Sequence, residues 1–148
     1  ACLAAGRGHS AVGGVSGGWA GHASAIVRGA LDTRVRDDSS DPAYLVAAIG
    51  PSIGPCCYEV GHEVVGQFGN LFPEWDTLTA RRNLDLVEAS RRHMEQGGVL
   101  LENIDTGEFC TACGTTLFES YRRDGEASGR MVSAISQGAT TLASRAAL

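Results

Sequence analysis

The feature that most constrains this chain is the segment at residues 50–55 (Gly-Pro-Ser-Ile-Gly-Pro), which no regular element can cross. Its two prolines lack backbone N–H donors, so the segment cannot continue a central strand. The apolar run before it, residues 44–49, is short enough to be a strand buried on both faces. We therefore expect a buried strand, then a rigid turn that directs residues 56–59 into a pocket or core.

The rest of the chain predicts short strands and helices that alternate irregularly. Apolar side chains favour helices at residues 22–35, 62–68 and 86–96. Asn83 or Asp85 can cap the last of these helices, and Gly97 can end it. We expect strands at residues 11–16, 99–104, 117–122 and 131–135, with a glycine turn at 17–21 and a polar loop at 37–42. This pattern predicts an α+β (mixed α/β) fold, and 148 residues suffice for one domain.

Charge and cysteine content narrow the function classes. A formal net charge of −5 argues against a nucleic-acid partner, because phosphate neutralisation needs a concentrated basic face. No apolar run approaches the roughly 18 residues that a membrane span requires, and residues 1–8 lack the apolar segment of a secretion signal. Five cysteines cannot all pair within the chain, and free or metal-bound thiols fit a reducing compartment. We therefore expect a cytoplasmic protein.

Several motifs, in order along the chain, resemble one known family. Residues 48–61 are similar along their length to the signature Gly-Pro-x-Ile-Gly-x-x-x-Tyr-Glu-Val of the laccase-domain family, also called the polyphenol-oxidase or peptidoglycan-editing-factor family. Residues 110–114, 118–125 and 129–131 resemble the family's closing segment, and residues 84–90 resemble the start of the helix that precedes it. The match covers nearly the whole chain.

The resemblance implies a fold and an activity. The fold is the family's layered architecture of mixed sheets covered by helices, here as one domain over residues 1–148 without the family's usual N-terminal region. The activity is metal-dependent phosphorolysis of purine nucleosides, in which phosphate attacks C1′ of adenosine, inosine, guanosine or methylthioadenosine. The family is also credited with adenosine deamination, in which metal-activated water attacks C6. The implied partners are therefore a purine nucleoside and phosphate.

The family's metal site, as the resemblance implies it, is incomplete here. It consists of two histidines and one cysteine, and Cys2 stands at the cysteine position. The second histidine begins a His-Ala-Gly-Trp-Arg-Gly motif, but this chain has Ser16 in place of that histidine and Ala20 in place of the arginine. A serine hydroxyl is a poor substitute for imidazole, so we expect weak zinc binding at this site, with copper less favoured than zinc. His22 could replace the lost imidazole, although a solvated or capping histidine is the simpler interpretation.

The resemblance also implies roles for individual side chains. An arginine fork matches phosphate oxygens, while the simpler reading of the same arginines is a salt bridge to Asp124. Tyr58 and Glu59 belong to the signature, and Trp19 to the motif that Ser16 opens. The implied catalytic residues are Cys2, Arg122 and Arg123, and the implied substrate-binding residues are Tyr58, Glu59 and Trp19.

The other cysteines allow two interpretations. Cys110 and Cys113 have the spacing of a zinc ribbon, but such a site needs a second pair, and the adjacent Cys56 and Cys57 are poorly spaced for one. We therefore expect structural burial of these cysteines. The alternative is a cysteine nucleophile in the adjacent pair with His62 as its base.

Two other function classes stay open. One is a non-catalytic binding domain that keeps the fold after losing the site, as Ser16 and Ala20 suggest. The other is a copper-dependent polyphenol oxidase, the older description of the family. Multicopper oxidation needs many histidine ligands, and this chain has four scattered ones.

Overall fold

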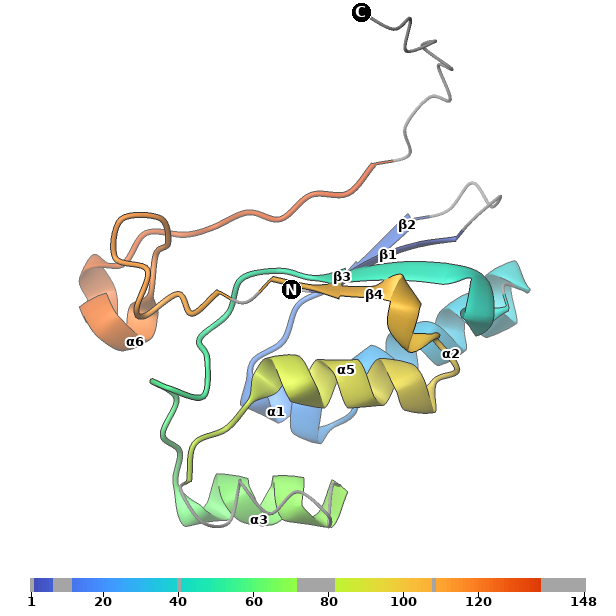
Figure 1. Ribbon diagram of the computed structural model, residues 1–148. Coiled ribbons are helices and arrows are strands. Elements are labelled where there is room, and N and C mark those ends of the chain that lie inside the picture. The colour runs from blue at the N-terminus through green and yellow to red at the C-terminus, as the bar shows by residue number, and fades with distance from the viewer. Residues whose placement is uncertain (1, 7–11, 40, 72–81, 108, 137–148) are drawn as a thin grey trace, which may run out of the picture.

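The computed structural model describes residues 2–6, 12–39, 41–71, 82–107 and 109–136 (Figure 1). Four strands form one sheet in the order β2-β1-β3-β4, in which β1 is antiparallel to both neighbours and β3 is parallel to β4. The strands are β1 (Cys2–Gly6), β2 (Val12–Val15), β3 (Leu45–Ile49) and β4 (Ile104–Thr106). The helices are α1 (Trp19–Ala23), α2 (Ile26–Asp38), α3 (His62–Leu71), α5 (Leu86–Gln96) and α6 (Tyr121–Asp124), with 3-10 helices η1 (Pro42–Tyr44), η2 (Leu101–Asn103) and η3 (Gly125–Ala127).

The helices form layers on one face of the sheet. Helices α1, α2 and α5 lie below the strands in Figure 1, and α3 lies in a further layer beneath them. The expected α+β class, with a mixed sheet covered by helices, is confirmed. Within the described residues, no helix is long and apolar enough to span a membrane.

The main core lies between the sheet and the helices α2 and α5. In β3, Leu45, Ala47 and Ile49 are buried, whereas Val46 between them is 38% exposed. The expectation that this strand is buried on both faces is therefore wrong, because the described helices cover only one face of the sheet. The cluster consists of Val27, Leu31, Leu45, Ala47, Ile49, Met94 and Val99.

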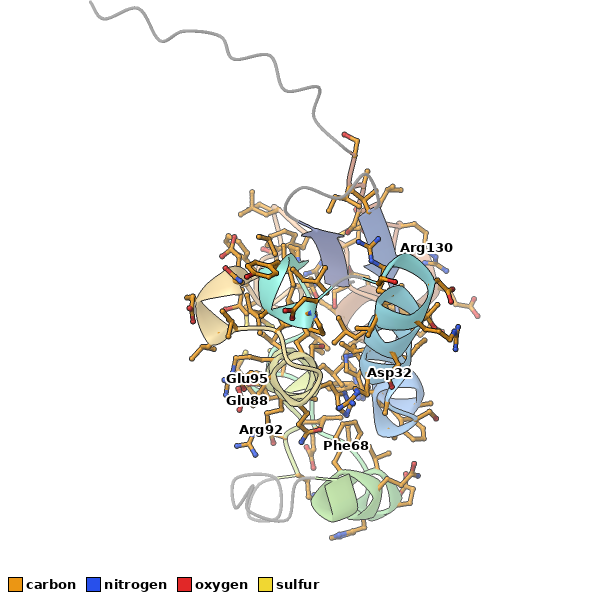
Figure 2. All side chains as sticks on the ribbon, turned by 90° about the vertical axis from the view of Figure 1, so that its right-hand side faces the viewer. Asp32, Phe68, Glu88, Arg92, Glu95 and Arg130 are labelled. Carbon is orange, nitrogen blue, oxygen red and sulfur yellow. The ribbon has the colours of Figure 1, made fainter. Side chains whose placement is uncertain are left out.

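A second core joins α3 to the layer above it. Phe68 is fully buried at its centre and points from α3 toward the other helices (Figure 2). Its buried members are Val60, Val64, Phe68, Leu84, Leu86 and Ala89. Trp19 and Tyr58 pack against this cluster partly buried, so two of the residues expected to bind substrate have one side committed to the core.

Several local predictions are confirmed. Residues 50–55 contain no regular strand and form only a single bridge at Ser52. The helix expected at residues 62–68 is α3, and the helix at residues 86–96 is α5. Asp85 caps α5, since its carboxylate accepts the Glu88 N–H at 2.9 Å, and Gly97 ends it.

The helix expected at residues 22–35 is instead two helices. Helix α1 begins at Trp19, inside the expected glycine turn, and α2 begins at Ile26 and continues to Asp38, into the expected polar loop. The break falls at Ala25, which has a left-handed φ of 53° and donates its N–H to the His22 carbonyl. This tight turn lets α1 direct His22 inward while α2 follows the sheet.

The strands expected late in the chain are wrong, except for part of the first. Residues 99–104 form η2 and lead into β4, residues 117–122 lead into α6, and residues 131–135 have no regular structure. Successive turns over residues 110–118 use the N–H groups that a strand ladder would need. The apolar side chains of the two expected strands are also not buried against a core, since Leu117 is 73% exposed and Val132 is 91% exposed. The Ala/Thr/Ser-rich sequence at residues 138–148 lies outside the described residues.

Candidate functional site

Side chains capable of binding or catalysis lie at one end of the sheet. Cys2 pairs with both Val15 and Ile49, and Ile49 pairs with Thr106. The chain segments that follow β2, β3 and β4 therefore all leave the sheet at the same end. Loops at such an end can place distant side chains together, as binding sites on rigid scaffolds often do.

A pocket of about 460 Å³ lies at this end. Ser16, which directly follows β2, and Pro51, which follows β3, form one side of the pocket. Residues of the closing segment form the other side. The pocket is lined by Ser16, Pro51, Glu119, Tyr121, Ser128, Gly129, Arg130, Met131 and Ser133.

The described lining of the pocket carries one cation and one carboxylate. Arg130 donates through Nη1 to the Ser128 and Gly129 carbonyls at 3.2 and 3.1 Å, and Glu119 accepts the Gly129 N–H at 2.8 Å. Both charged groups thus fix the loop around Gly129, and the guanidinium has further donors for an anion. Neither Arg130 nor Glu119 was among the predicted site residues, although Arg130 lies in the closing motif at residues 129–131.

The described residues of this pocket do not fit the metal trio that the resemblance implies. Ser16 presents a hydroxyl and is exposed, and Ala20, also exposed, presents a methyl group. No histidine lines the part of the pocket that the structure describes. Cys2 begins β1 beside Val15, but its side chain lies outside the described part of the chain. Its predicted roles as catalytic residue and metal ligand stay predictions.

His22, the alternative imidazole, is buried rather than solvated. Its Nδ1 donates to the Gly18 carbonyl at 2.9 Å, and its Nε2 lies 2.7 Å from the Ser90 hydroxyl. The adjoining hollow, also lined by Ser52, is small, with a volume of about 30 Å³. Both ring nitrogens are thus engaged within the chain. The interpretation of His22 as a solvated or capping histidine is wrong, because α1 turns this side chain toward Ser90 of α5.

We expect acid to destabilise the fold through this histidine. Burial lowers the pKa of His22 from its ordinary 6.5, although the Gly18 carbonyl opposes the shift. The neutral ring is therefore favoured in the folded state, and its contribution to stability is present above pH 6.5 and lost as pH falls toward the folded pKa. Urea unfolding across this range should show stability falling with pH, less steeply for His22→Gln than for the exposed-site control His62→Gln. Equal slopes in the two variants would refute this role.

Arg122 lies over the turn that carries Tyr58 and Glu59 of the family signature (the signature turn). It does not line the pocket that contains Ser16 (the Ser16 pocket). Its guanidinium stacks 5.0 Å from the Tyr58 ring centre, and Nη2 donates to the Glu59 carbonyl at 2.9 Å. The Glu59 carboxylate accepts from Arg82 at 2.6 Å. The structure thus brings three predicted site residues together in one exposed cluster with Arg82. Their catalytic and substrate-binding roles stay predictions.

Arg123 holds the closing segment together. It donates to the carbonyls of Thr111, Ala112 and Phe118 at 2.9, 3.3 and 3.0 Å. Two further bonds, at 2.8 and 2.7 Å, pair it with Asp124, and this pairing raises the pKa of Arg123. The salt bridge that was the simpler reading is therefore present. The predicted catalytic role of Arg123 remains a prediction.

The four described cysteines come together, contrary to the sequence-based expectation of structural burial. The Sγ atoms of Cys56, Cys57, Cys110 and Cys113 all lie within 4.8 Å of one another, and this group could hold a metal ion. Cys56 and Cys113 are exposed and the other two are partly exposed. The turn at residues 55–57, closed by N–H bonds to the Gly54 carbonyl, lets adjacent cysteines present their thiols to one side. Sequence spacing alone did not reveal this second pair.

Cys110 is the most acidic of these thiols. Partial burial raises its pKa, but N–H groups of Gly54, Cys113 and Ala112 outweigh that effect and lower the pKa from 9.0 to about 6. The Gly54 N–H donates to the Cys110 sulfur at 3.3 Å. The pKa of Cys56 is raised, chiefly by its hydrogen bond with Cys110. The alternative of a cysteine nucleophile with His62 has no support from a contact between them in the described residues.

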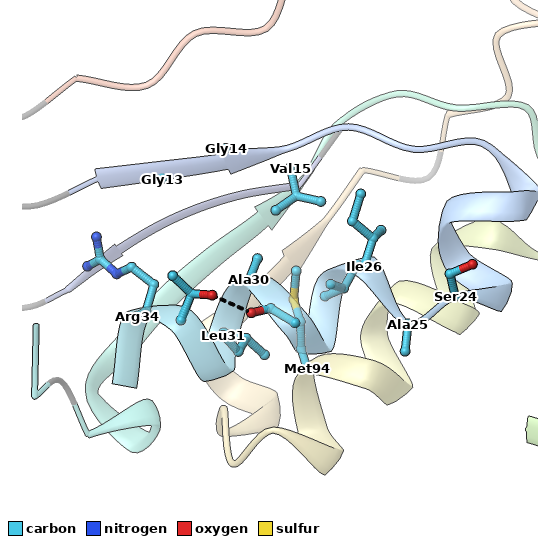
Figure 3. Close-up of a pocket in the computed structure, with 13 residues that line it drawn as sticks. Gly13, Gly14, Val15, Ser24, Ala25, Ile26, Ala30, Leu31, Arg34 and Met94 are labelled. Atoms are coloured by element: carbon cyan, nitrogen blue, oxygen red, sulfur yellow. Dashed lines mark hydrogen bonds between the residues drawn. The ribbon is translucent and has the colours of Figure 1, made fainter. Parts of the chain in front are cut away.

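A separate apolar pocket lies between β2 and α2 (Figure 3). It measures about 480 Å³ and is bounded by Gly13, Gly14 and Val15 on the strand and by one face of the helix. Arg34 stands at its rim (Figure 3). Among the predicted site residues whose side chains the structure describes, none lines it. Its lining offers no pair of groups for acid–base or nucleophilic chemistry, so we place the candidate site at Ser16.

Comparison with known proteins identifies relatives of this chain. The chain is 37% identical over 124 residues to the purine nucleoside phosphorylase YlmD of Geobacillus stearothermophilus, covering 80% of this chain and 45% of that protein. It is 32% identical to the adenosine deaminase RL5 of an unknown prokaryotic organism, covering 80% of this chain and 47% of that protein. The crystal structure of the hypothetical protein YfiH of Bacillus licheniformis matches with a TM-score of 0.76 and 33% identity, over 82% of this chain and 48% of that one.

The chain thus spans about half the length of the curated relatives it matches. A family model described as multi-copper polyphenol oxidoreductase laccase matches residues 2–137, nearly the whole chain. The motifs, the fold and the relatives all agree with that match. The chain belongs to this laccase-domain family.

Proposed function

We propose that this chain is part of a purine nucleoside phosphorylase whose phosphate and sugar bind in the Ser16 pocket. The observation that carries the proposal is the placement of Arg130 and Glu119 in one pocket with Ser16, at the sheet end where Cys2 also lies. Relatives named purine nucleoside phosphorylase support the reaction class. Purine nucleosides and inorganic phosphate are the proposed partners, and a nucleic acid is not.

The pocket groups suit this reaction. Phosphate attacks C1′, the bond to the base breaks, and the sugar passes through a state with cationic character. Arg130 provides a planar cation for the phosphate oxygens. Glu119 provides a carboxylate that can accept from sugar hydroxyls or face the developing positive charge, and the hydroxyls of Ser16, Tyr121 and Ser128 add further partners.

Substitution of the pocket arginine tests the proposal. Arg130→Ala should raise the KM for phosphate by about 10- to 100-fold, because a hydrogen bond to a charged group contributes about 1.5–3 kcal/mol. The KM for the nucleoside should change much less. Steady-state phosphorolysis of inosine at varied phosphate concentration measures both constants.

Arg36→Ala is a matched control for this experiment. Arg36 is exposed on α2, paired with the adjacent Asp37, and lies outside the pocket lining. Its loss should leave both KM values unchanged. If Arg130→Ala leaves the phosphate KM unaltered, the proposal that phosphate binds in this pocket is wrong.

Adenosine deamination is a second candidate, because one relative is named adenosine deaminase. That reaction depends on metal-activated water. Since Ser16 and Ala20 do not supply the expected imidazole and cation, we propose that deamination is weaker here than phosphorolysis. If a metal acts at this site, we propose zinc rather than copper.

Two further alternatives rank lower. A polyphenol oxidase needs histidine clusters, and within the described residues no histidine joins a group of potential metal ligands. A purely binding role would explain Ser16 but gives no reason for a charged pocket around it. We also propose that residues 1–148 form a single domain. We propose further that the protein is cytoplasmic, because no disulfide joins the four described cysteines, and free or metal-bound thiols fit a reducing compartment.

A further inference from the structure

We propose that Cys56, Cys57, Cys110 and Cys113 bind one structural zinc ion, at a site separate from the Ser16 pocket. None of the four lines that pocket. The ion would join the turn after β3 to the turn after β4. Its role is to fix the closing segment against the sheet end.

The sulfur geometry matches zinc. A zinc–thiolate bond is about 2.3 Å long, so the sulfurs of a tetrahedral four-thiolate site lie about 3.8 Å apart. Here Cys56 and Cys57 lie 3.6 and 3.3 Å from the Cys113 sulfur, and all four sulfurs lie within 4.8 Å of one another. Small side-chain rotations would therefore complete the tetrahedron. Four thiolates with no histidine or carboxylate favour zinc over magnesium or calcium.

The backbone around the cysteines already holds the two turns in register. The Thr111 N–H donates to the Ser52 carbonyl at 2.9 Å, and Ser52 and Cys110 form an isolated parallel bridge. Gly54 leaves room for this approach, since a Cβ there would lie 3.2 Å from the Cys110 Cβ. Arg123 fixes the second turn by donating to the carbonyls of Thr111 and Ala112, and it also pairs with Asp124. The ligands are thus preorganised on both sides.

The closing segment needs such a crosslink. Among the described residues after Val99, no apolar side chain is fully buried, and the buried residues are the polar Thr111 and Ser120. Phe109, Leu117 and Met131 are all about half exposed or more. A segment without its own hydrophobic core is commonly stabilised by a metal or disulfides. The zinc would therefore supply what apolar packing does not.

Metal analysis of the chain, purified under reducing conditions, tests the proposal. We expect about one zinc per chain after dialysis, and little or none in Cys110→Ser or in Cys56→Ser/Cys113→Ser. Cys2→Ser is the matched control, because Cys2 is the remaining cysteine and lies in β1, so it should keep its zinc. Retention in the cluster variants but loss in Cys2→Ser would overturn the proposal and place the metal at the family trio.

A spectroscopic measurement covers variants that fail to fold. Cobalt(II) added to the metal-free wild-type chain should give the intense visible absorption of tetrahedral thiolate coordination, and zinc should displace it. Weak absorption typical of oxygen ligands would contradict the assignment. Thiol titration with and without reductant detects the rival outcome, since a disulfide in place of the metal would lower the number of reactive thiols and overturn the proposal. Nucleoside phosphorolysis is not needed for any of these readings, so this proposal can fail while the proposed function stands.

Discussion

Replacing Ser16 by histidine together with Ala20 by arginine should raise adenosine phosphorolysis by at least about 100-fold, the effect typical of one preorganised charge-stabilising group. Ser16 opens into the pocket that holds Glu119 and Arg130, so an imidazole there would lie beside the proposed phosphate and sugar. An arginine at position 20 would add a fixed cation on α1. Deamination should rise as well, because the new imidazole restores a ligand for the metal that activates water.

This experiment compares the unaltered protein, both single variants and the double variant. The relatives are about twice as long as this chain, so the assay uses the longest natural polypeptide that contains it. Base release from adenosine is followed with and without phosphate, alongside inosine formation. If the double variant changes neither rate, the placement of the site at Ser16 is mistaken.

Phe68→Ala should lower the free energy of unfolding by about 3–5 kcal/mol, a large fraction of the roughly 5–15 kcal/mol of a typical domain. Phe68 is fully buried and points from α3 toward the layer above it (Figure 2). It belongs to one core cluster with Val64, Leu84 and Ala89. Its removal leaves a cavity that these neighbours cannot fill. Because Tyr58 packs on the same cluster, the signature turn should also lose order.

Denaturant unfolding monitored by circular dichroism measures this effect. Val46→Ala is the control, because Val46 is 38% exposed on the uncovered face of β3, and it should cost far less. A loss below about 1 kcal/mol for Phe68→Ala would mean that α3 does not depend on this core. It would also leave the position of Tyr58 without support from packing.

The parts of the fold that depend on neighbouring residues could be predicted from the sequence. Asp85 and Gly97 bound α5 through contacts within one helical turn, and the prolines at 51 and 55 prevent a strand by their own geometry. The late strands failed for the opposite reason. Leu117 and Val132 have strand-forming character, but both side chains are exposed, and among the described residues no strand pairs with either segment.

The candidate site depended on contacts between distant segments. Cys56 and Cys113 are 57 residues apart, and they meet because β3 and β4 pair in parallel and release their loops at the same end. No sequence spacing encodes that meeting. Arg130 was likewise not predicted as a site residue, because it becomes a candidate only through its position in the same pocket as Ser16. The sequence predicted catalytic roles for the adjacent Arg122 and Arg123, but in the structure both side chains donate to backbone carbonyls.

The most direct test of the central claim is product analysis of the unaltered protein with adenosine and inosine. The account predicts base release that requires inorganic phosphate, equimolar formation of a sugar phosphate, and slower conversion of adenosine to inosine. Isotopically labelled phosphate would appear in the sugar product. Two results would contradict the assignment of this pocket to phosphate-dependent cleavage. One is base release at the same rate without phosphate, and the other is adenosine deamination faster than phosphorolysis.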